Sequence, residues 1–124
     1  MSPTGRRTAA QLAGGEAEEV AERFLVRRGL EVIARNYRTR LGEIDLVARD
    51  GATLVFVEVR MRAASAARFG GAAASVDARK RRRIEAAARH FLARLGREPA
   101  CRFDVVTLDG ASAIEWHRAA FETA

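Results

Sequence analysis

The sequence predicts an α/β fold in which helices flank a mixed β-sheet. Two amphipathic segments with helical spacing alternate with runs rich in Val, Ile and Leu, a pattern typical of helices layered on a sheet. Asp-Gly turn signals at 50–51 and 109–110 separate consecutive runs. The predicted order of elements is α-β-β-β-α-β-β, and 124 residues suffice for one domain with one core.

The first helix is predicted over about residues 14–28, because apolar residues recur there at helical spacing and Gly29 follows as a cap. Its predicted buried stripe is Ala17, Val20, Ala21, Phe24 and Leu25. Residues 1–10 are polar and are expected to be flexible. Residues 11–124 are therefore the predicted domain.

Strands are predicted at about 30–34, 43–49 and 53–60, and the last two flank the turn signal of a hairpin. Residues 61–75, rich in Ala and Gly, are predicted to form a long loop. A second helix is predicted over about 77–95, where Ile84, Ala88, Phe91, Leu92 and Leu95 form its apolar stripe. A fourth strand at 102–109 and a short edge strand at 114–116 complete the sheet.

Composition restricts the classes of function. A net charge of +6, from 22 basic and 16 acidic residues, favours a polyanionic partner, of which nucleic acid is the commonest. One cysteine and two histidines exclude a disulfide framework and a Cys/His zinc site. No apolar run has the length of a signal peptide or a membrane span, so a cytoplasmic protein with no membrane partner is expected.

The central hairpin places two carboxylates face to face. With a two-residue loop, either Gly51-Ala52 or Asp50-Gly51, one face carries Ile44, Leu46 and Ala48 with Val55, Val57 and Val59. The other face carries Glu43, Asp45 and Val47 with Leu54, Phe56, Glu58 and Arg60. In the Gly51-Ala52 register Asp45 lies directly opposite Glu58.

Two facing carboxylates repel each other unless a cation joins them. Mg²⁺ is commonly held by one or two carboxylates together with water and phosphate oxygens, so Asp45 and Glu58 are candidate ligands for Mg²⁺ or Mn²⁺. A cation bound there would polarise a phosphodiester and lower the pKa of an attacking water. The alternative is a solvated sheet face whose acids pair with Arg49 and Arg60.

Basic residues open the second helix, at Arg79, Lys80, Arg81, Arg82 and Arg83. Cations are unfavourable at this end of the helix dipole, which indicates an external anion such as DNA phosphate. Lys80 lies on the stripe that faces the sheet, whereas Arg81 and Arg82 are predicted to point outward. A solvated basic face is the alternative.

A third carboxylate is available from the first helix, where position alone does not choose between Glu18 and Glu22.

These residues together resemble the YraN-like family of uncharacterised bacterial proteins, and behind it the restriction-endonuclease-like PD-(D/E)XK superfamily, which includes archaeal Holliday junction resolvases. The resemblance covers nearly all of the chain after residue 10. The segments that carry it are Arg35-Asn36, Gly42-Glu43-Ile44-Asp45-Leu46, Val55-Phe56-Val57-Glu58-Val59-Arg60 with Arg62, Val76 with Lys80, Arg102-Phe103-Asp104-Val105-Val106, and Ala120-Phe121.

The resemblance implies a restriction-endonuclease-like core in which Asp45 and Glu58 are metal ligands and Arg60 takes the position of the motif lysine. It also implies a carboxylate from the first helix, which the helix contacts place on Glu18 and an alternative register on Glu16. Arginine does not give up a proton near neutral pH. Either Arg60 acts electrostatically, or Lys80, the single lysine, supplies the amine, or the protein binds nucleic acid without cutting it.

We therefore expect a Mg²⁺-dependent nuclease acting on DNA, with branched DNA as one candidate substrate. Its catalytic residues would be Asp45, Glu58, Arg60 and Glu18, and its DNA contacts Arg62, Arg79, Lys80, Arg81, Arg82 and Arg83. A non-catalytic DNA-binding protein that keeps the fold is the alternative. A small-molecule enzyme is less favoured, since the chain has no glycine-rich phosphate loop. Relatives in the superfamily often dimerise, so a homodimer is also expected.

Overall fold

A computed structural model describes residues 15–61, 76–109 and 113–121 of the chain. The predicted flexible N-terminus, almost all of the predicted long loop and Arg62 lie outside the described residues. The described elements are α1 (Glu16–Arg27), β1 (Glu31–Arg38), β2 (Glu43–Asp50), β3 (Thr53–Met61), α2 (Ala78–Leu95), β4 (Cys101–Leu108) and β5 (Ile114–Phe121). The predicted order of elements is confirmed.

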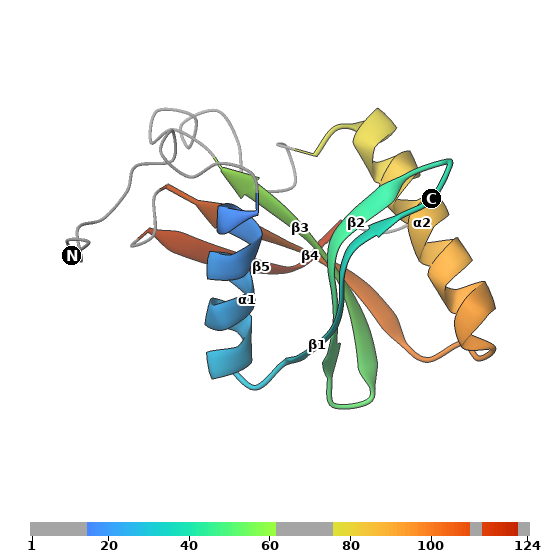
Figure 1. The fold of residues 1–124 in the computed structure, drawn as a ribbon, viewed down its shortest axis with the longest axis horizontal. Coiled ribbons are helices and arrows are strands. Elements are labelled where there is room, and N and C mark those ends of the chain that lie inside the picture. The colour runs from blue at the N-terminus through green and yellow to red at the C-terminus, as the bar shows by residue number, and fades with distance from the viewer. Residues whose placement is uncertain (1–14, 62–75, 110–112, 122–124) are drawn as a thin grey trace.

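The five strands form one mixed sheet in the order β1-β2-β3-β4-β5. β3 and β4 run parallel, and every other neighbouring pair is antiparallel. Figure 1 shows α1 on one side of the sheet and α2 on the other. An α/β fold with a mixed sheet flanked by helices is thus confirmed. In the described part of the chain, neither helix is both long and apolar enough to cross a membrane.

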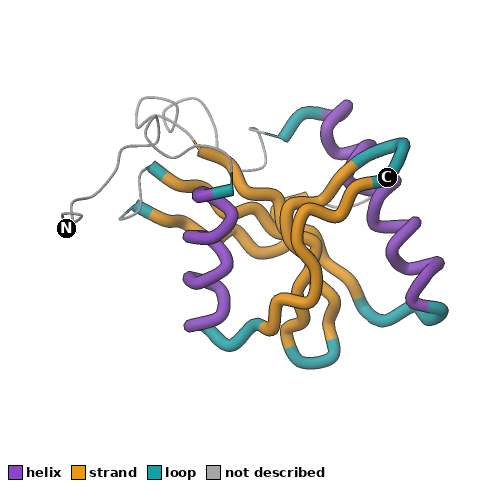
Figure 2. The backbone as a smooth tube through the Cα atoms, in the orientation of Figure 1, coloured by secondary structure: helices purple, strands orange, loops and turns teal. Residues whose placement is uncertain are grey.

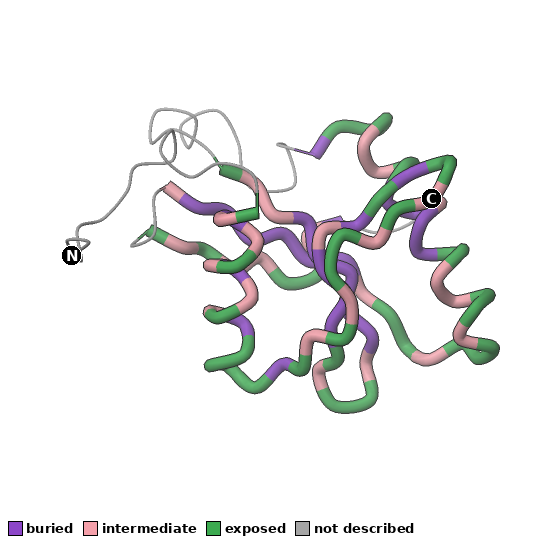
Figure 3. Tube along the Cα trace, in the orientation of Figure 1, coloured by how far each residue is buried: buried purple, intermediate pink, exposed green. Residues whose placement is uncertain are grey.

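Each helix packs over its own apolar cluster, so the sheet is covered on both faces (Figure 3). The cluster under α1 joins buried residues of the helix to Leu46, Ala48, Val55 and Val57 of the central hairpin. The cluster under α2 joins Ile84, Ala87 and Ala88 to Val47, Phe56 and Phe103 of the sheet. Both predicted helix stripes therefore face the sheet.

The β2–β3 hairpin has the two-residue loop Gly51-Ala52, since Asp50 pairs with Thr53. Gly51 has a φ of 62°, a left-handed conformation that glycine adopts without strain. The last pair of this ladder is Leu46 with Val57. Asp45 and Glu58 come next on their strands, directly beyond that pair, as the Gly51-Ala52 register predicts.

One part of the face prediction is wrong, because Ile44 packs in the α2 cluster and not beside Leu46 under α1. The cause lies in the neighbouring strand, where Asn36 has a φ of 49°. Residues two apart on a regular strand share a face. Across Asn36 they do not, since Arg35 bonds Glu22 of α1 whereas Tyr37 contacts Phe91 of α2. Near Asp45, the side chains of β1 and β2 that would point toward α1 in a regular strand therefore point toward α2.

The outer strands are longer than predicted. β5 runs to Phe121, and β1 runs to Arg38. Both lie at edges of the sheet, where half of the side chains are exposed and can be polar. Polar residues such as Asn36, Glu115 and His117 therefore interrupt the apolar pattern from which the strand ends were predicted.

The turn that connects β1 to β2 is fixed against α2. Thr39 closes it, because the Thr39 hydroxyl accepts hydrogen bonds from the N–H groups of Leu41 and Gly42. Gly42 leaves no space for a side chain, since an added Cβ would lie 1.8 Å from the carbonyl oxygen of Arg83. Glycine at position 42 therefore lets the backbone of the turn approach the backbone of α2.

Gly42→Ala should lower the free energy of unfolding by about 1–3 kcal/mol, because the turn or the helix must move to admit the methyl group. Urea denaturation followed by circular dichroism measures the change. Gly15→Ala is the matched control, since a Cβ there meets nothing within 4 Å, and it should change stability by less than about 0.5 kcal/mol. Equal stability of the two variants would contradict the close approach.

Candidate functional site

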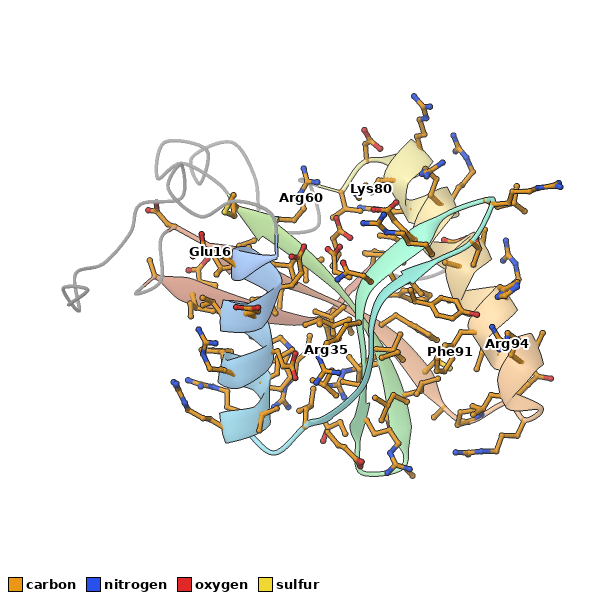
Figure 4. The ribbon with its side chains drawn as sticks, in the orientation of Figure 1. Glu16, Arg35, Arg60, Lys80, Phe91 and Arg94 are labelled. Carbon is orange, nitrogen blue, oxygen red and sulfur yellow. The ribbon has the colours of Figure 1, made fainter. Side chains whose placement is uncertain are left out.

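The predicted carboxylates and the single lysine meet where β2 and β3 stop pairing, close to the first turn of α2. Figure 4 shows Arg60, from the end of β3, and Lys80, from the start of α2, near one another at this edge of the molecule. Asp45, Glu58, Arg60 and Lys80 are thus brought together by three separate elements.

Asp45 is held in place by the backbone of the neighbouring strand. One of its carboxylate oxygens accepts a hydrogen bond of 2.8 Å from the N–H of Val59. Because the β2–β3 ladder has ended, that N–H no longer bonds a carbonyl of β2, and the carboxylate takes the carbonyl's place. Asp45 is therefore oriented toward Glu58, the residue before Val59. The strand pattern gives no indication of this backbone donor.

Glu58 is a buried acid, with only 4% of its surface exposed. Its Oε2 lies 3.1 Å from Nζ of Lys80 and 3.7 Å from a guanidinium nitrogen of Arg60. Burial raises the pKa of Glu58 to about 7, and the charge of Asp45 adds to this rise while Lys80 opposes it. A single ammonium group therefore does not offset the two adjacent carboxylates.

Glu18 of α1 lies close enough to Asp45 to sense its charge. Burial raises the pKa of Glu18, the charge of Asp45 raises it further, and Arg38 lowers it. This coupling favours Glu18 over Glu16 and Glu22 as the carboxylate that α1 directs toward the site. Even so, no three acidic, histidine or cysteine side chains within residues 15–61, 76–109 and 113–121 form a group that could hold a metal ion.

Basic residues line a cavity of about 250 Å³ beside Glu58. Its lining consists of Arg60, Asp77, Arg79, Lys80 and Arg83. The expectation that Lys80 faces the sheet is confirmed by its contact with Glu58. One phosphate group could enter such a cavity and meet several cations at once.

Arg81 does not point outward as predicted. Its Nε donates to the carbonyl of Val76, and its guanidinium lies 5.3 Å from the ring centre of Phe121. The reason is that position 81 borders the buried stripe of α2, where a cation can cover an aromatic ring. Arg82 is exposed, as expected.

The basic first turn of α2 is stabilised by Asp77. This residue is the N-cap, and its side chain accepts a hydrogen bond of 2.8 Å from the backbone N–H of Lys80. A negative charge here also offsets the helix dipole, which the consecutive cations at 79–83 oppose. An aspartate just before a helical pattern is the signal by which the sequence could have indicated this cap.

The donor set fits a divalent cation such as Mg²⁺. Two carboxylates converge, and Mg²⁺ bound by two carboxylates completes its coordination with water and phosphate oxygens. The mutual repulsion of Asp45 and Glu58 is the electrostatic condition that a bound cation would relieve.

The chain is similar to a large family of bacterial proteins. The sequence model of Uncharacterised protein family UPF0102 matches residues 17–108, from α1 to the end of β4. A UPF0102 protein of Methylobacillus flagellatus is 58% identical over 110 residues, which are 87% of this chain and 95% of the relative. A UPF0102 protein of Ralstonia nicotianae is 61% identical over 123 residues, 97% of this chain and 91% of the relative. The names of these relatives state no activity.

Glu58→Gln should change how stability depends on pH. Because burial raises the pKa of folded Glu58 from 4.5 to about 7, protonated Glu58 stabilises the fold below about pH 4.5. That stabilisation is lost as the pH rises through 7. Between about pH 5 and about pH 8, the wild type should lose roughly 1–3 kcal/mol relative to Glu58→Gln.

Urea denaturation across this pH range measures the difference, and Glu43→Gln controls for the loss of an exposed negative charge nearby. A stability difference between wild type and Glu58→Gln that is constant with pH would contradict the raised pKa of Glu58.

Proposed function

The chain belongs to the uncharacterised protein family UPF0102, and we propose that it is a divalent-metal-dependent nuclease that hydrolyses phosphodiester bonds in DNA. One observation carries the proposal. Two facing carboxylates, one of them buried, adjoin an amine and a cavity whose lining is basic apart from Asp77. This arrangement matches what phosphodiester hydrolysis requires, namely ligands for a metal ion, a group that positions water, and cations that receive phosphate.

Asp45 and Glu58 are the proposed ligands of Mg²⁺ or Mn²⁺, with Glu18 as a third carboxylate that acts through water. When bound, the ion would polarise the phosphodiester and lower the pKa of the attacking water. Glu58 must be ionised to serve as a ligand. Because its pKa is about 7, we expect metal affinity to increase as the pH rises through 7.

Lys80 supplies the amine that Arg60 cannot. Its Nζ lies 3.1 Å from Glu58, a proposed metal ligand, so the amine adjoins the place where the attacking water would bind and is proposed to hold it by a hydrogen bond. Arg60 is farther from Glu58, at 3.7 Å, and it lines the cavity beside the site. Its role is therefore to stabilise the negative charge that develops on the phosphoryl group.

Arg79, Arg82 and Arg83 are the proposed phosphate contacts of α2, together with the charge of Lys80. Such contacts bind DNA without reading its sequence and weaken steeply with salt. Arg38 and Arg40, exposed near the β1–β2 turn, extend this basic surface although the sequence did not single them out. A restriction-endonuclease-like fold, a cytoplasmic location, branched DNA as substrate and a homodimer remain predictions.

A second candidate function is DNA binding without cleavage, and the presence of Arg60 at the position of the motif lysine favours it. In that case the carboxylates would hold a structural cation, and Lys80 would serve only as the partner of Glu58. The two candidates share the DNA-binding surface and differ in whether a phosphodiester is hydrolysed.

Wild-type protein should cleave plasmid or branched DNA when Mg²⁺ or Mn²⁺ is present, and Asp45→Ala and Glu58→Ala should abolish this cleavage because each removes a proposed metal ligand. Gel electrophoresis of the products and calorimetric titration with Mn²⁺ measure activity and metal binding separately. Glu43→Ala is the control, since it removes an exposed carboxylate from the same strand as Asp45. If wild type binds DNA without metal and cleaves it no faster than Asp45→Ala and Glu58→Ala do, the second candidate is favoured.

Lys80→Met should lower the cleavage rate by about 100-fold while DNA binding weakens only slightly, because its amine is proposed to hold the attacking water. Arg60→Gln should lower the rate by roughly tenfold, because it removes one charged contact to phosphate. Single-turnover cleavage and filter binding give the two quantities. A larger effect of Arg60→Gln than of Lys80→Met would reverse the assigned roles.

A further inference from the structure

Leu41 projects from the β1–β2 turn into solvent, with 66% of its surface exposed. Among the described residues it is the most exposed of the large hydrophobic side chains. Figure 2 shows this turn at the end of the β1–β2 pair, beside the N-terminal half of α2. An isolated exposed leucine is common on protein surfaces, so exposure alone assigns it no role.

The turn that carries Leu41 cannot fold back onto the core. The Thr39 hydroxyl accepts the N–H groups of Leu41 and Gly42, at 3.2 and 3.1 Å, and the Thr39 N–H donates to the Gly42 carbonyl at 2.8 Å. The contact between Gly42 and the Arg83 backbone fixes the turn to α2. Leu41 is therefore held outward on a rigid support, which a flexible surface loop would not provide.

The surroundings of Leu41 are basic and adjoin the candidate site. Arg40 precedes it, and Arg83, against whose backbone the turn packs, also lines the cationic cavity. Asp45 follows Gly42 by three residues on β2. Leu41 therefore neighbours, through Gly42, the segment of α2 that supplies Arg83 to the cationic cavity.

We propose that Leu41 inserts between two stacked base pairs next to the bound phosphates and partly unstacks them. This inference rests on the proposed function, since it takes duplex DNA as the ligand. Apolar side chains on minor-groove and architectural proteins act as such wedges, and arginines beside them bind the flanking phosphates. A rigid support is needed, because a flexible loop would be displaced by the stacked bases and would not separate them.

An inserted leucine would select one class of DNA substrate. Separating stacked base pairs costs least where stacking is already weak, so the protein should prefer a duplex that contains one mismatched base pair over a fully matched duplex. Leu41 supplies this preference, whereas the arginines, which contact only phosphates, bind both duplexes alike.

The test uses a duplex with 2-aminopurine, whose fluorescence rises when it is unstacked, next to a single mismatch. Binding is measured with EDTA present so that no cleavage occurs. Wild-type protein should increase the fluorescence and prefer the mismatched duplex, and Leu41→Ala should remove most of the increase. The preference of Leu41→Ala for the mismatch should fall roughly tenfold, as expected when an inserted leucine is truncated.

Val26→Ala is the matched control, because Val26 is a large apolar residue of α1 with 50% of its surface exposed. It should behave as the wild type, and Leu41→Met should retain the fluorescence increase. If wild type binds DNA without a fluorescence change, or if Leu41→Ala gives the same increase, the wedge is wrong while the proposed function stands. If wild type binds neither duplex at low salt, either in EDTA or with Mg²⁺ present, the proposed function fails and the wedge fails with it.

Discussion

The electrostatic repulsion between Asp45 and Glu58 is the constraint on which the rest of the site depends. Two carboxylates beyond the last pair of a hairpin ladder are unfavourable unless other groups compensate them. The fold supplies the Val59 N–H to Asp45 and the Lys80 ammonium to Glu58. The end of the β2–β3 ladder makes the first of these contacts possible, since only an unpaired N–H can bond the aspartate. The repulsion between the two carboxylates thus lowers the stability of the fold at the place where we propose that hydrolysis occurs.

The hairpin and its carboxylates could be predicted because they follow from the two-residue period of a strand and the length of one turn. Asp50, Gly51 and Ala52 fix that length, and counting back along β2 then places Asp45 directly opposite Glu58. Lys80 could be placed for a similar reason, since it lies four residues before Ile84 on the helical stripe. Local periodicity therefore accounts for the positions of these residues that the structure confirms.

What could not be predicted depends on contacts between distant elements. The left-handed Asn36 reverses the faces of β1 and β2, and a single polar residue within a strand gives no indication of this. The Arg81 side chain points toward the sheet because its guanidinium contacts the ring of Phe121, forty residues later in the chain. The backbone donor to Asp45 arises only once the strands part. Side-chain type alone carries none of this information, because each feature depends on the final packing of the chain.

One side of helix α2 makes two separate contacts, one with the candidate site and one with the β1–β2 turn. Lys80 and Arg83 are three residues apart and so lie on the same side of the helix, one beside Glu58 and the other against Gly42. A rotation of α2 about its axis would displace the ammonium group and the β1–β2 turn together. A one-residue insertion between Lys80 and Arg83 would rotate one of them off this side of the helix, so that only one of the two contacts could be kept. The spacing of this short basic segment is therefore under a geometric restriction that its charge alone would not impose.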